Sequence, residues 1–351
     1  MRANAPQVAV PPPDAMTSQS VLVTGASGFI GGHLVRRLTA HGCRVSCLVR
    51  ASSRVDELRV TGARLIPCDI AHRGRIADAI AASGARVVFH LAGLVRAMDP
   101  GDFMRVNAGG VEEVAQACTD QPDRPVLVLV SSLAAAGPSR DRPTVESDSP
   151  MPVSNYGRSK LEGEQVAMRY AYSLPITVVR PCIVFGAGDR GMFEVFKPIA
   201  RSGLHVVGGS RDSRFSLVAV ADLVECLVLA AERGERLAPG LAGRGIYFAA
   251  AEDVSYGDLG PLIAGALGKP QPRILRLPDW SMRTIGRFGD VVSRIRGRPG
   301  WIGRDKMRDV LAGSWTCSSA KARQQLGWSP AAPLADRLSE TARWYRDAHW
   351  L

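Results

Sequence analysis

Apolar runs alternate along this chain with segments whose apolar residues recur at helical spacing. Residues 21–23 and 126–130 are uninterrupted apolar runs, as in strands buried on both faces of a parallel sheet. After the first run, Ile30, Leu34 and Leu38 recur every four residues, which is the pattern of a helix that packs on a sheet. This alternation predicts an α/β protein with a Rossmann-type, doubly wound parallel sheet.

The same patterns extend the prediction along the chain. We predict further strands at 44–50, 64–69, 86–93, 124–132 and 177–186, and further helices at 107–118 and 156–172. Residues 215–222 predict another strand that leads into a helix, with Asp222 as its N-cap. A chain of 351 residues suits a large α/β domain with a smaller second lobe.

Three glycines stand between the first strand and the first helix. Strand, glycine turn and helix form the geometry that binds a dinucleotide, because glycine lets the backbone approach a pyrophosphate. The helix N-terminus then offers free N–H groups to that anion. The residues of this turn expected to bind the cofactor are Gly25, Ser27, Gly28, Phe29, Ile30 and Gly31. We therefore predict an NAD(P)-binding domain at 20–181 with the catalytic residues. The smaller C-terminal α/β lobe, 182–351, would bind substrate, and residues about 215–233 would return to the first domain.

The end of the second predicted strand indicates which cofactor to expect. An acidic residue there would bind the ribose 2′-hydroxyl of NAD, but Arg50 occupies that place. Arginine favours a 2′-phosphate through charge-assisted hydrogen bonds. We therefore predict NADP as the cofactor, with NAD as the alternative. The alternative is that Arg50 has no role in cofactor binding and is an exposed residue at a strand end.

Candidate catalytic residues follow the fifth predicted strand. Ser132 ends this strand, and Tyr156 and Lys160 lie four residues apart in the next helix, so that they share one face. A nearby ammonium lowers the pKa of a phenol, which could then exchange a proton with a substrate oxygen. Ser132 could hold the same oxygen while a hydride moves to or from the nicotinamide. This set predicts a hydride-transfer enzyme with a small-molecule substrate.

The glycine turn, the strand-end serine and the tyrosine–lysine pair, in this order, resemble the extended short-chain dehydrogenase/reductase family. The resemblance runs from about 20 to about 350 and includes the NAD-dependent epimerases and dehydratases. It implies that Ser132, Tyr156 and Lys160 form the catalytic triad, Ser132 being preferred to Ser131 for its spacing to Gly137. It also implies that Asn107 supports the site, although the threonine that often follows in the family is missing here.

The resemblance implies further cofactor contacts at the strand ends. Asp69 and Ile70 would meet the adenine. The remaining expected contacts are Leu91, Ala92 and Gly93 after the fourth strand, Pro181, Ile183 and Val184 near the nicotinamide, and Tyr156 and Lys160 themselves. His90 lies inside an apolar strand end, and we expect it to be structural rather than catalytic.

Two positions bear on the branch of the family. Cys182 stands where the nucleotide-sugar branch usually has an asparagine, and Phe215 stands where that branch often has a diphosphate-binding arginine. Arg214 is adjacent but would face the other way in a strand. Both departures favour an oxidoreductase of a rather apolar secondary alcohol or ketone, in the branch of 3β-hydroxysteroid dehydrogenases and dihydroflavonol reductases. The alternatives are a nucleotide-sugar epimerase or dehydratase with the same triad, and a cofactor sensor without turnover.

The net charge of +11 comes mostly from scattered arginines. No nucleic-acid motif accompanies it, so nucleic-acid binding is not expected. Residues 278–296 predict a basic amphipathic helix, apolar at Ile285, Phe288, Val292 and Ile295. It would pack as a lid over the substrate lobe, or bind a membrane surface if the substrate is lipid-like.

The remaining expectations concern the cysteines, the N-terminal residues, the cellular location and the oligomeric state. The seven scattered cysteines have no metal-ligand spacing and predict reduced thiols. Residues 1–19 lack the apolar core of a secretory signal and predict a disordered leader. We therefore expect a cytoplasmic protein. The family resemblance implies a homodimer formed through 107–118 and 156–172.

Overall fold

Seven parallel strands form the large sheet of this protein, whose computed structural model describes residues 16–209 and 213–351. The strand order is β10-β6-β5-β4-β1-β2-β3, so the chain winds outward in both directions from β1, and the predicted Rossmann-type fold is confirmed. The strands are β1 (Ser20–Thr24), β2 (Arg44–Val49), β3 (Arg64–Pro67), β4 (Val87–His90), β5 (Val126–Val130), β6 (Ile176–Pro181) and β10 (Ile246–Ala249). Their carboxyl ends meet along one edge, which is where such sheets place their ligands.

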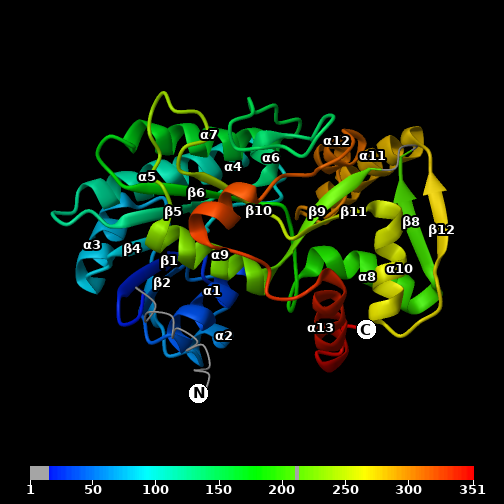
Figure 1. Cartoon of the computed structure of the whole chain (residues 1–351), viewed down its shortest axis with the longest axis horizontal. Helices are drawn as coiled ribbons and strands as arrows, with labels where there is room; N and C mark the ends of the chain where they lie inside the picture. The colour runs from blue at the N-terminus through cyan, green and yellow to red at the C-terminus, as the bar shows by residue number, and fades with distance from the viewer. Residues whose placement is uncertain (1–15, 210–212) are drawn as a thin grey trace, which may run out of the picture.

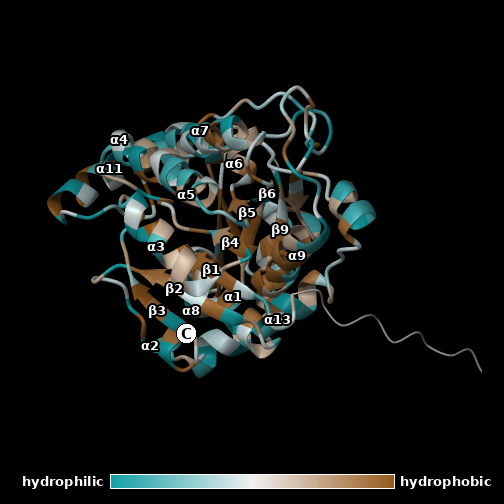
Figure 2. Ribbon diagram, turned by 90° about the vertical axis from the view of Figure 1, so that its left-hand side faces the viewer, coloured by the Kyte–Doolittle hydropathy of each residue, from teal (hydrophilic) through white to brown (hydrophobic). Residues whose placement is uncertain are grey.

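Helices cover both faces of this sheet, which explains why its central strands are mostly apolar (Figures 1 and 2). On one face, α1 (Phe29–Ala40) packs against α9 (Val220–Arg233), and on the other α3 (Arg73–Ser83), α5 (Gly109–Thr119) and α7 (Asn155–Tyr170) lie side by side. Two separate apolar cores fill these faces. Short helices join the strands: α2 (Asp56–Arg59), α4 (Pro100–Phe103), the π-helical turn η1 (Met104–Ala108) and α6 (Leu133–Ala136).

A smaller lobe lies beside the carboxyl edge of the large sheet (Figure 1). It contains a three-stranded sheet in the order β11-β9-β7 and a two-stranded sheet of β12 and β8. Its strands are β7 (Ile183–Phe185), β8 (Leu204–Gly208), β9 (Arg214–Ala219), β11 (Glu252–Ser255) and β12 (Arg273–Leu277). Its helices are α8 (Arg190–Ser202), α10 (Tyr256–Ala266), α11 (Asp279–Ile295), α12 (Arg304–Leu311) and α13 (Leu334–Asp347). The π-helical turn η2 (Ala322–Leu326), which precedes α13, packs against α9 and β10 of the large lobe.

The chain crosses between the lobes at Cys182. We expected one strand over 177–186, but the structure divides it into β6 in the large sheet and β7 in the small one. The two strands belong to different sheets, so the backbone changes direction between Pro181 and Ile183. The chain later returns to the large lobe, where α9 packs beside α1 and β10 pairs with β6.

Two expectations about local structure are wrong in detail. Ala219, not Asp222, is the N-cap of α9. Asp222 is buried in the first turn and binds Arg337 at 2.7 Å, which ties the C-terminal segment to the sheet. Residues 1–15 of the predicted leader lie outside the described residues. Met16 is 2% exposed and packs into the core beside Cys43, so the core of the protein includes a residue before the first strand.

Candidate active site

The glycine turn after β1 is shaped so that only glycine fits at two of its positions. Gly25 has a φ of +70°, and a Cβ there would lie 2.6 Å from the backbone nitrogen of Ala92. A Cβ on Gly31 would lie 2.2 Å from the carbonyl oxygen of Gly25. Gly28 is the N-cap of α1, and because glycine has no side chain it forms no capping hydrogen bond with the helix. The turn therefore packs tightly against β4 and leaves the first N–H groups of α1 free for an anion.

A cavity of about 1770 Å³ extends from this turn into the smaller lobe. The expected site residues that line it are Gly25, Ser27, Gly28, Phe29, Ile30, Gly31, Leu91, Gly93, Ser132, Tyr156, Lys160, Pro181, Ile183 and Val184. The cavity exceeds the roughly 300–1,000 Å³ of an ordinary small-molecule site, so it has room for a dinucleotide and a second large ligand.

Other expected site residues lie off the cavity wall. Arg50 is exposed at the end of β2, whereas Arg54 and Arg36 line the cavity near the glycine turn. Asp69 is exposed, and its carboxylate accepts a hydrogen bond from the backbone N–H of Ala71 at 3.0 Å. Ile70 and Ala92 likewise do not line the cavity.

Ser132 and Tyr156 meet at the centre of the cavity. Ser132 follows β5 and is the N-cap of α6, where its hydroxyl accepts a hydrogen bond from the N–H of Ala134 at 3.1 Å. The Tyr156 phenol hydrogen-bonds the Ser132 side chain. Desolvation raises the pKa of Tyr156; the Ser132 hydrogen bond opposes this rise, and the charge of Asp309 adds to it. The phenol therefore stays protonated at neutral pH, contrary to our expectation of a lowered pKa.

Lys160 lies one helical turn beyond Tyr156 and donates to the carbonyl oxygen of Val130 at 2.7 Å. Desolvation lowers its pKa to about 8, while the charge of Glu164 acts to raise it. Glu164 is itself buried and forms an ion pair with Arg180 at 2.5 Å, and it also contacts the Ser131 hydroxyl. Our sequence reasoning missed Glu164, although its spacing of four residues from Lys160 places both on one face of α7.

Asn107 lies behind the cavity wall rather than in it. Its side chain accepts from the N–H of Leu94 at 2.7 Å and donates to the Leu94 carbonyl at 2.9 Å. It also donates to the Ser159 hydroxyl at 2.9 Å. A Cβ on Gly93 would lie 2.9 Å from the Asn107 side-chain oxygen and 3.8 Å from the Lys160 ammonium. Asn107 thus fixes the chain after β4 against the helix that carries Lys160.

His90 is buried and hydrogen-bonds the Thr24 hydroxyl at 2.8 Å. Burial, together with the smaller effect of the nearby charge of Lys160, lowers its pKa to about 3. It is therefore neutral at physiological pH and does not line the cavity. These contacts give His90 a structural environment, as we expected from its position in an apolar strand.

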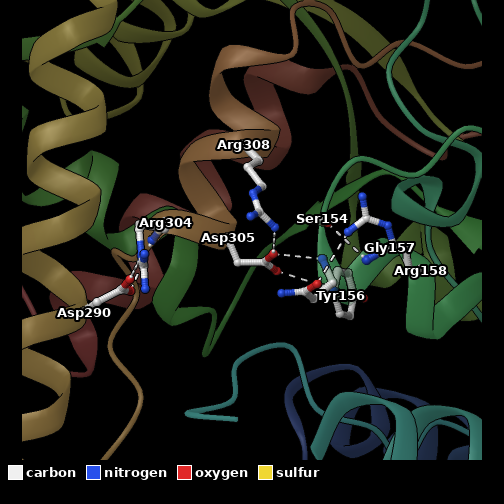
Figure 3. Close-up of polar contacts among 9 residues, drawn as sticks. Ser154, Tyr156, Gly157, Arg158, Asp290, Arg304, Asp305 and Arg308 are labelled. Carbon is white, nitrogen blue, oxygen red and sulfur yellow. Dashed lines mark hydrogen bonds and ion pairs between the residues drawn. The ribbon is translucent and has the colours of Figure 1, made fainter. Parts of the chain in front are cut away.

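The smaller lobe contributes a carboxylate that the sequence did not reveal. Figure 3 shows Asp305 pointing from α12 toward the start of α7, where it accepts from the N–H groups of Asn155 at 2.8 Å and Tyr156 at 3.3 Å. Ser154 completes this N-cap by accepting from the N–H of Gly157 at 3.1 Å. A carboxylate at this end of a helix is favoured by the helix dipole. Asp305 therefore couples the smaller lobe to the helix that bears Tyr156.

Asp309 lies one turn further along α12 and also lines the cavity. It hydrogen-bonds Ser154, and its pKa is raised mainly by desolvation. Within the described parts of the chain, its Oδ1 atom is buried and has no hydrogen-bond partner. The smaller lobe thus places a polar acceptor close to the Tyr156 phenol.

Comparison with known proteins decides the family. The model of the NAD dependent epimerase/dehydratase family matches residues 21–242. This chain belongs to the NAD-dependent epimerase/dehydratase family. The resemblance to extended short-chain dehydrogenases/reductases is thereby confirmed.

Family relatives with different reactions match nearly the whole chain. A ceramide reductase of Caulobacter vibrioides is 33% identical over 331 residues, which cover 94% of this chain and 96% of the relative. A UDP-glucose 4-epimerase of Vibrio cholerae is 24% identical over 347 residues, which cover 96% and 98%. The solved structure of MoeE5 in complex with UDP-glucose and NAD has a TM-score of 0.71 at 23% identity, covering 94% of this chain and 99% of that one, and so shares the fold.

The residues of this epimerase/dehydratase-family chain fit a dinucleotide. Gly25 and Gly31 permit the close backbone approach, and the N-terminus of α1 can receive the pyrophosphate. Such a cofactor would supply or accept the hydride. No helix among the described residues combines the length and hydrophobicity that a bilayer crossing requires.

Proposed function

We propose that this protein is an NAD(P)-dependent oxidoreductase that reduces a ketone to a secondary alcohol on a rather apolar substrate. The observation that carries this proposal is the Tyr156 phenol, hydrogen-bonded to Ser132 in a cavity that is also lined by Phe215 of the smaller lobe. A protonated phenol can give its proton to a carbonyl oxygen, as ketone reduction requires.

Each catalytic side chain has a defined task in this proposal. Ser132 donates a hydrogen bond to the substrate carbonyl oxygen and holds it beside Tyr156. Tyr156 gives its proton to that oxygen as the carbonyl carbon gains a hydride, so that the product is a neutral alcohol. Lys160 lies one turn further along α7, and its positive charge stabilises the phenolate that remains. Glu164 keeps the lysine charged at neutral pH by opposing its desolvation.

The cavity wall supports an apolar substrate. Phe215 lines the cavity, whereas Arg214 is exposed and donates to the backbone carbonyl of Asp253 at 3.0 Å. The residue at the place of the family's diphosphate-binding arginine is thus apolar. The names of two relatives agree with a reductase: the ceramide reductase at 33% identity and a ketoreductase of Stigmatella aurantiaca at 32% identity over 219 residues.

A nucleotide-sugar epimerase or dehydratase is the second candidate. Arg96 and Arg190 line the cavity and lie close enough for the charge of Arg190 to affect the pKa of Arg96, which is lowered mainly by desolvation. Such a pair could bind a diphosphate in place of the missing arginine. A screen decides between the candidates by following NADPH oxidation with long-chain ketones and sugar conversion with UDP-glucose. Net oxidation supports the reductase, and sugar conversion without net oxidation supports the epimerase. Cofactor binding with neither reaction would favour the sensor.

We further propose NADP as the cofactor, bound through Arg50. Replacing Arg50 by alanine is expected to weaken NADPH binding about tenfold and to leave NADH binding unchanged, because only the 2′-phosphate is lost as a partner. Calorimetry with both cofactors measures this. Arg54→Ala is the matched variant, because Arg54 lines the cavity while Arg50 does not. Selective weakening in Arg54→Ala alone would transfer the role to Arg54, and tighter binding of NADH by the wild type would contradict the proposal.

Lys160 is expected to set the alkaline limit of the reaction. Its pKa is lowered to about 8, so its ammonium loses a proton as the pH rises through that value. We expect kcat/KM for ketone reduction to fall about tenfold per pH unit above about pH 8. A pH profile from about 6 to 10 measures this. Lys160→Arg keeps its charge and should remove the alkaline limb, at a lower plateau. An unchanged wild-type rate through about pH 9 would contradict the assignment.

The homodimer through α5 and α7 remains a prediction of the family resemblance, and the cytoplasmic location remains a prediction from the N-terminal residues and the scattered cysteines. Sedimentation of the purified protein and fractionation of cells test them.

A further inference from the structure

We propose that the outer face of α11 docks on an anionic lipid bilayer. The inference rests on the proposed function only in that both assume an apolar substrate. The docking surface itself does not include the proposed catalytic residues. The surface consists of an apolar ridge on α11, formed by Trp280, Phe288, Val291 and Ile295, and of the arginines beside it.

The ridge is a stripe of exposed residues on the side of α11 that faces away from the protein. Its members are 70%, 69%, 50% and 81% exposed, in chain order. At 3.6 residues per turn, their spacing places them within about 80° of the helix circumference. Our expectation that the apolar positions of this helix pack onto the substrate lobe is therefore wrong for Phe288 and Ile295.

Small residues on the opposite side of α11 make the contact with the protein. A Cβ on Gly286 would lie 2.6 Å from Cγ of Met307 on α12, and one on Gly289 would lie 2.4 Å from the carbonyl oxygen of Ile302. Ser293 is also buried on this side and accepts from the N–H of Gly300 at 3.0 Å. Because the helix packs through these residues, its position does not require the ridge, which is left without a partner in the described chain.

The charge around the ridge matches an anionic surface. Residues 273–298 contain seven arginines and two aspartates and so carry +5 of the chain's net +11. Within residues 16–209 and 213–351, no ion pair is formed by the exposed side chains of Arg283, Arg287, Arg294, Arg296 or Arg298. Basic side chains beside exposed tryptophan and phenylalanine are the pattern of a helix that lies in a membrane interface.

The same charge argues against a second copy of this chain as the occupant. A twofold contact between two α11 helices would bring the unpaired arginines of both copies together, and like charges across an interface are costly. Anionic lipids instead neutralise these charges while the ridge enters the boundary between headgroups and acyl chains. We therefore commit to a lipid surface of negative charge.

The docking surface is connected to the active site. Ser293 and Arg294 of α11 line the cavity together with Trp301 and Ile302, so the cavity reaches this helix. Figure 3 shows Asp290 of α11 bound to Arg304 of α12, with 2.5 Å between Asp290 Oδ2 and Arg304 Nε. The next residue, Asp305, holds the start of α7. A lipid-like substrate could thus pass from the bilayer into the cavity without crossing water.

Vesicle co-sedimentation of the full chain tests the docking. The probes are vesicles of phosphatidylcholine alone and vesicles with about one-third phosphatidylglycerol. We expect binding to the anionic vesicles at least tenfold stronger than to the neutral ones, and weakened by salt. The double variant Phe288→Ser/Ile295→Ser and the double variant Arg283→Gln/Arg287→Gln should each reduce this binding about tenfold. Val60→Ser/Tyr172→Ser is the matched control, because both residues are 86% exposed but lie outside the smaller lobe.

Three results would overturn the docking: equal binding to both vesicle types, no binding, or equal losses in the control. Light scattering of the variants measures their molar mass and tests whether a second copy of the chain covers the ridge instead. A wild-type dimer that dissociates in Phe288→Ser/Ile295→Ser would assign the ridge to that second copy. A short, water-soluble ketone separates this test from the proposed reaction. Turnover of that ketone without vesicle binding rejects docking alone, and vesicle binding without turnover of any ketone rejects the reductase alone.

Discussion

Replacing Tyr156 by phenylalanine is expected to lower kcat/KM for ketone reduction by about 10²–10⁴. The variant loses the hydroxyl that hydrogen-bonds Ser132 and that donates the proton, while the ring and its contact with Phe103 remain. Cofactor affinity should change much less than kcat/KM: Tyr156 is one expected cofactor contact, but the glycine turn and α1, which would hold the pyrophosphate, are untouched. Steady-state kinetics and calorimetry on the same preparation measure the two quantities.

A matched control for this variant is Tyr172→Phe. Tyr172 follows α7 and is 86% exposed, so its hydroxyl has no place in the cavity. Its kinetics should equal those of the wild type. If Tyr156→Phe retained more than about one-tenth of the activity, Tyr156 would not be the proton donor, and Asp309 would become the next candidate because it lines the cavity nearby.

Replacing Glu164 by glutamine is expected to lower the free energy of unfolding by about 3–5 kcal/mol. Glu164 and Arg180 are 6% and 2% exposed, and the substitution leaves the arginine's charge buried without its partner. The loss should also lower the pKa of Lys160 further, because the charge of Glu164 acts to raise it. Urea unfolding measures the stability, and the alkaline limb of kcat/KM in the folded variant should move to lower pH.

Glu112→Gln is the control for this second variant. Glu112 forms an ion pair with Arg169 at 3.0 Å on the surface, where their side chains are 43% and 64% exposed. Its loss should cost about 1 kcal/mol or less, because water screens such pairs. A comparable loss of stability in both variants would show that the buried position of Glu164 has no special effect.

The two lobes meet at the start of α7, the helix that carries Tyr156 and Lys160. Asp305 reaches the first N–H groups of α7 from a position 149 residues beyond Tyr156. Substrate that displaces α12 would therefore also act on the helix that positions the phenol. The cavity residues of α12, including Asp309, lie where a ligand in the smaller lobe would make contact. The smaller lobe thus contributes Asp305 and Asp309 to the wall of the candidate site.

The sequence by itself determined the architecture, and it placed Tyr156 and Lys160 on one helix face of the candidate site. Its apolar runs and helical spacings predicted the parallel sheet because burial on both faces and packing on one face leave different periods in a sequence. The glycine turn was predictable for a similar reason, since Gly25 and Gly31 act through their local backbone. Tyr156 and Lys160 were brought to one face by helix geometry alone.

Only the tertiary structure decided the contacts between segments far apart in the chain. Asp305 at the start of α7, the pair of Asp222 with Arg337, and the division of 177–186 between two sheets depend on how the lobes pack. A sequence pattern reports which face of a helix is apolar, but it does not report what covers that face. For this reason the pattern of α11 predicted a buried stripe, whereas packing through Gly286 and Gly289 left Phe288 exposed.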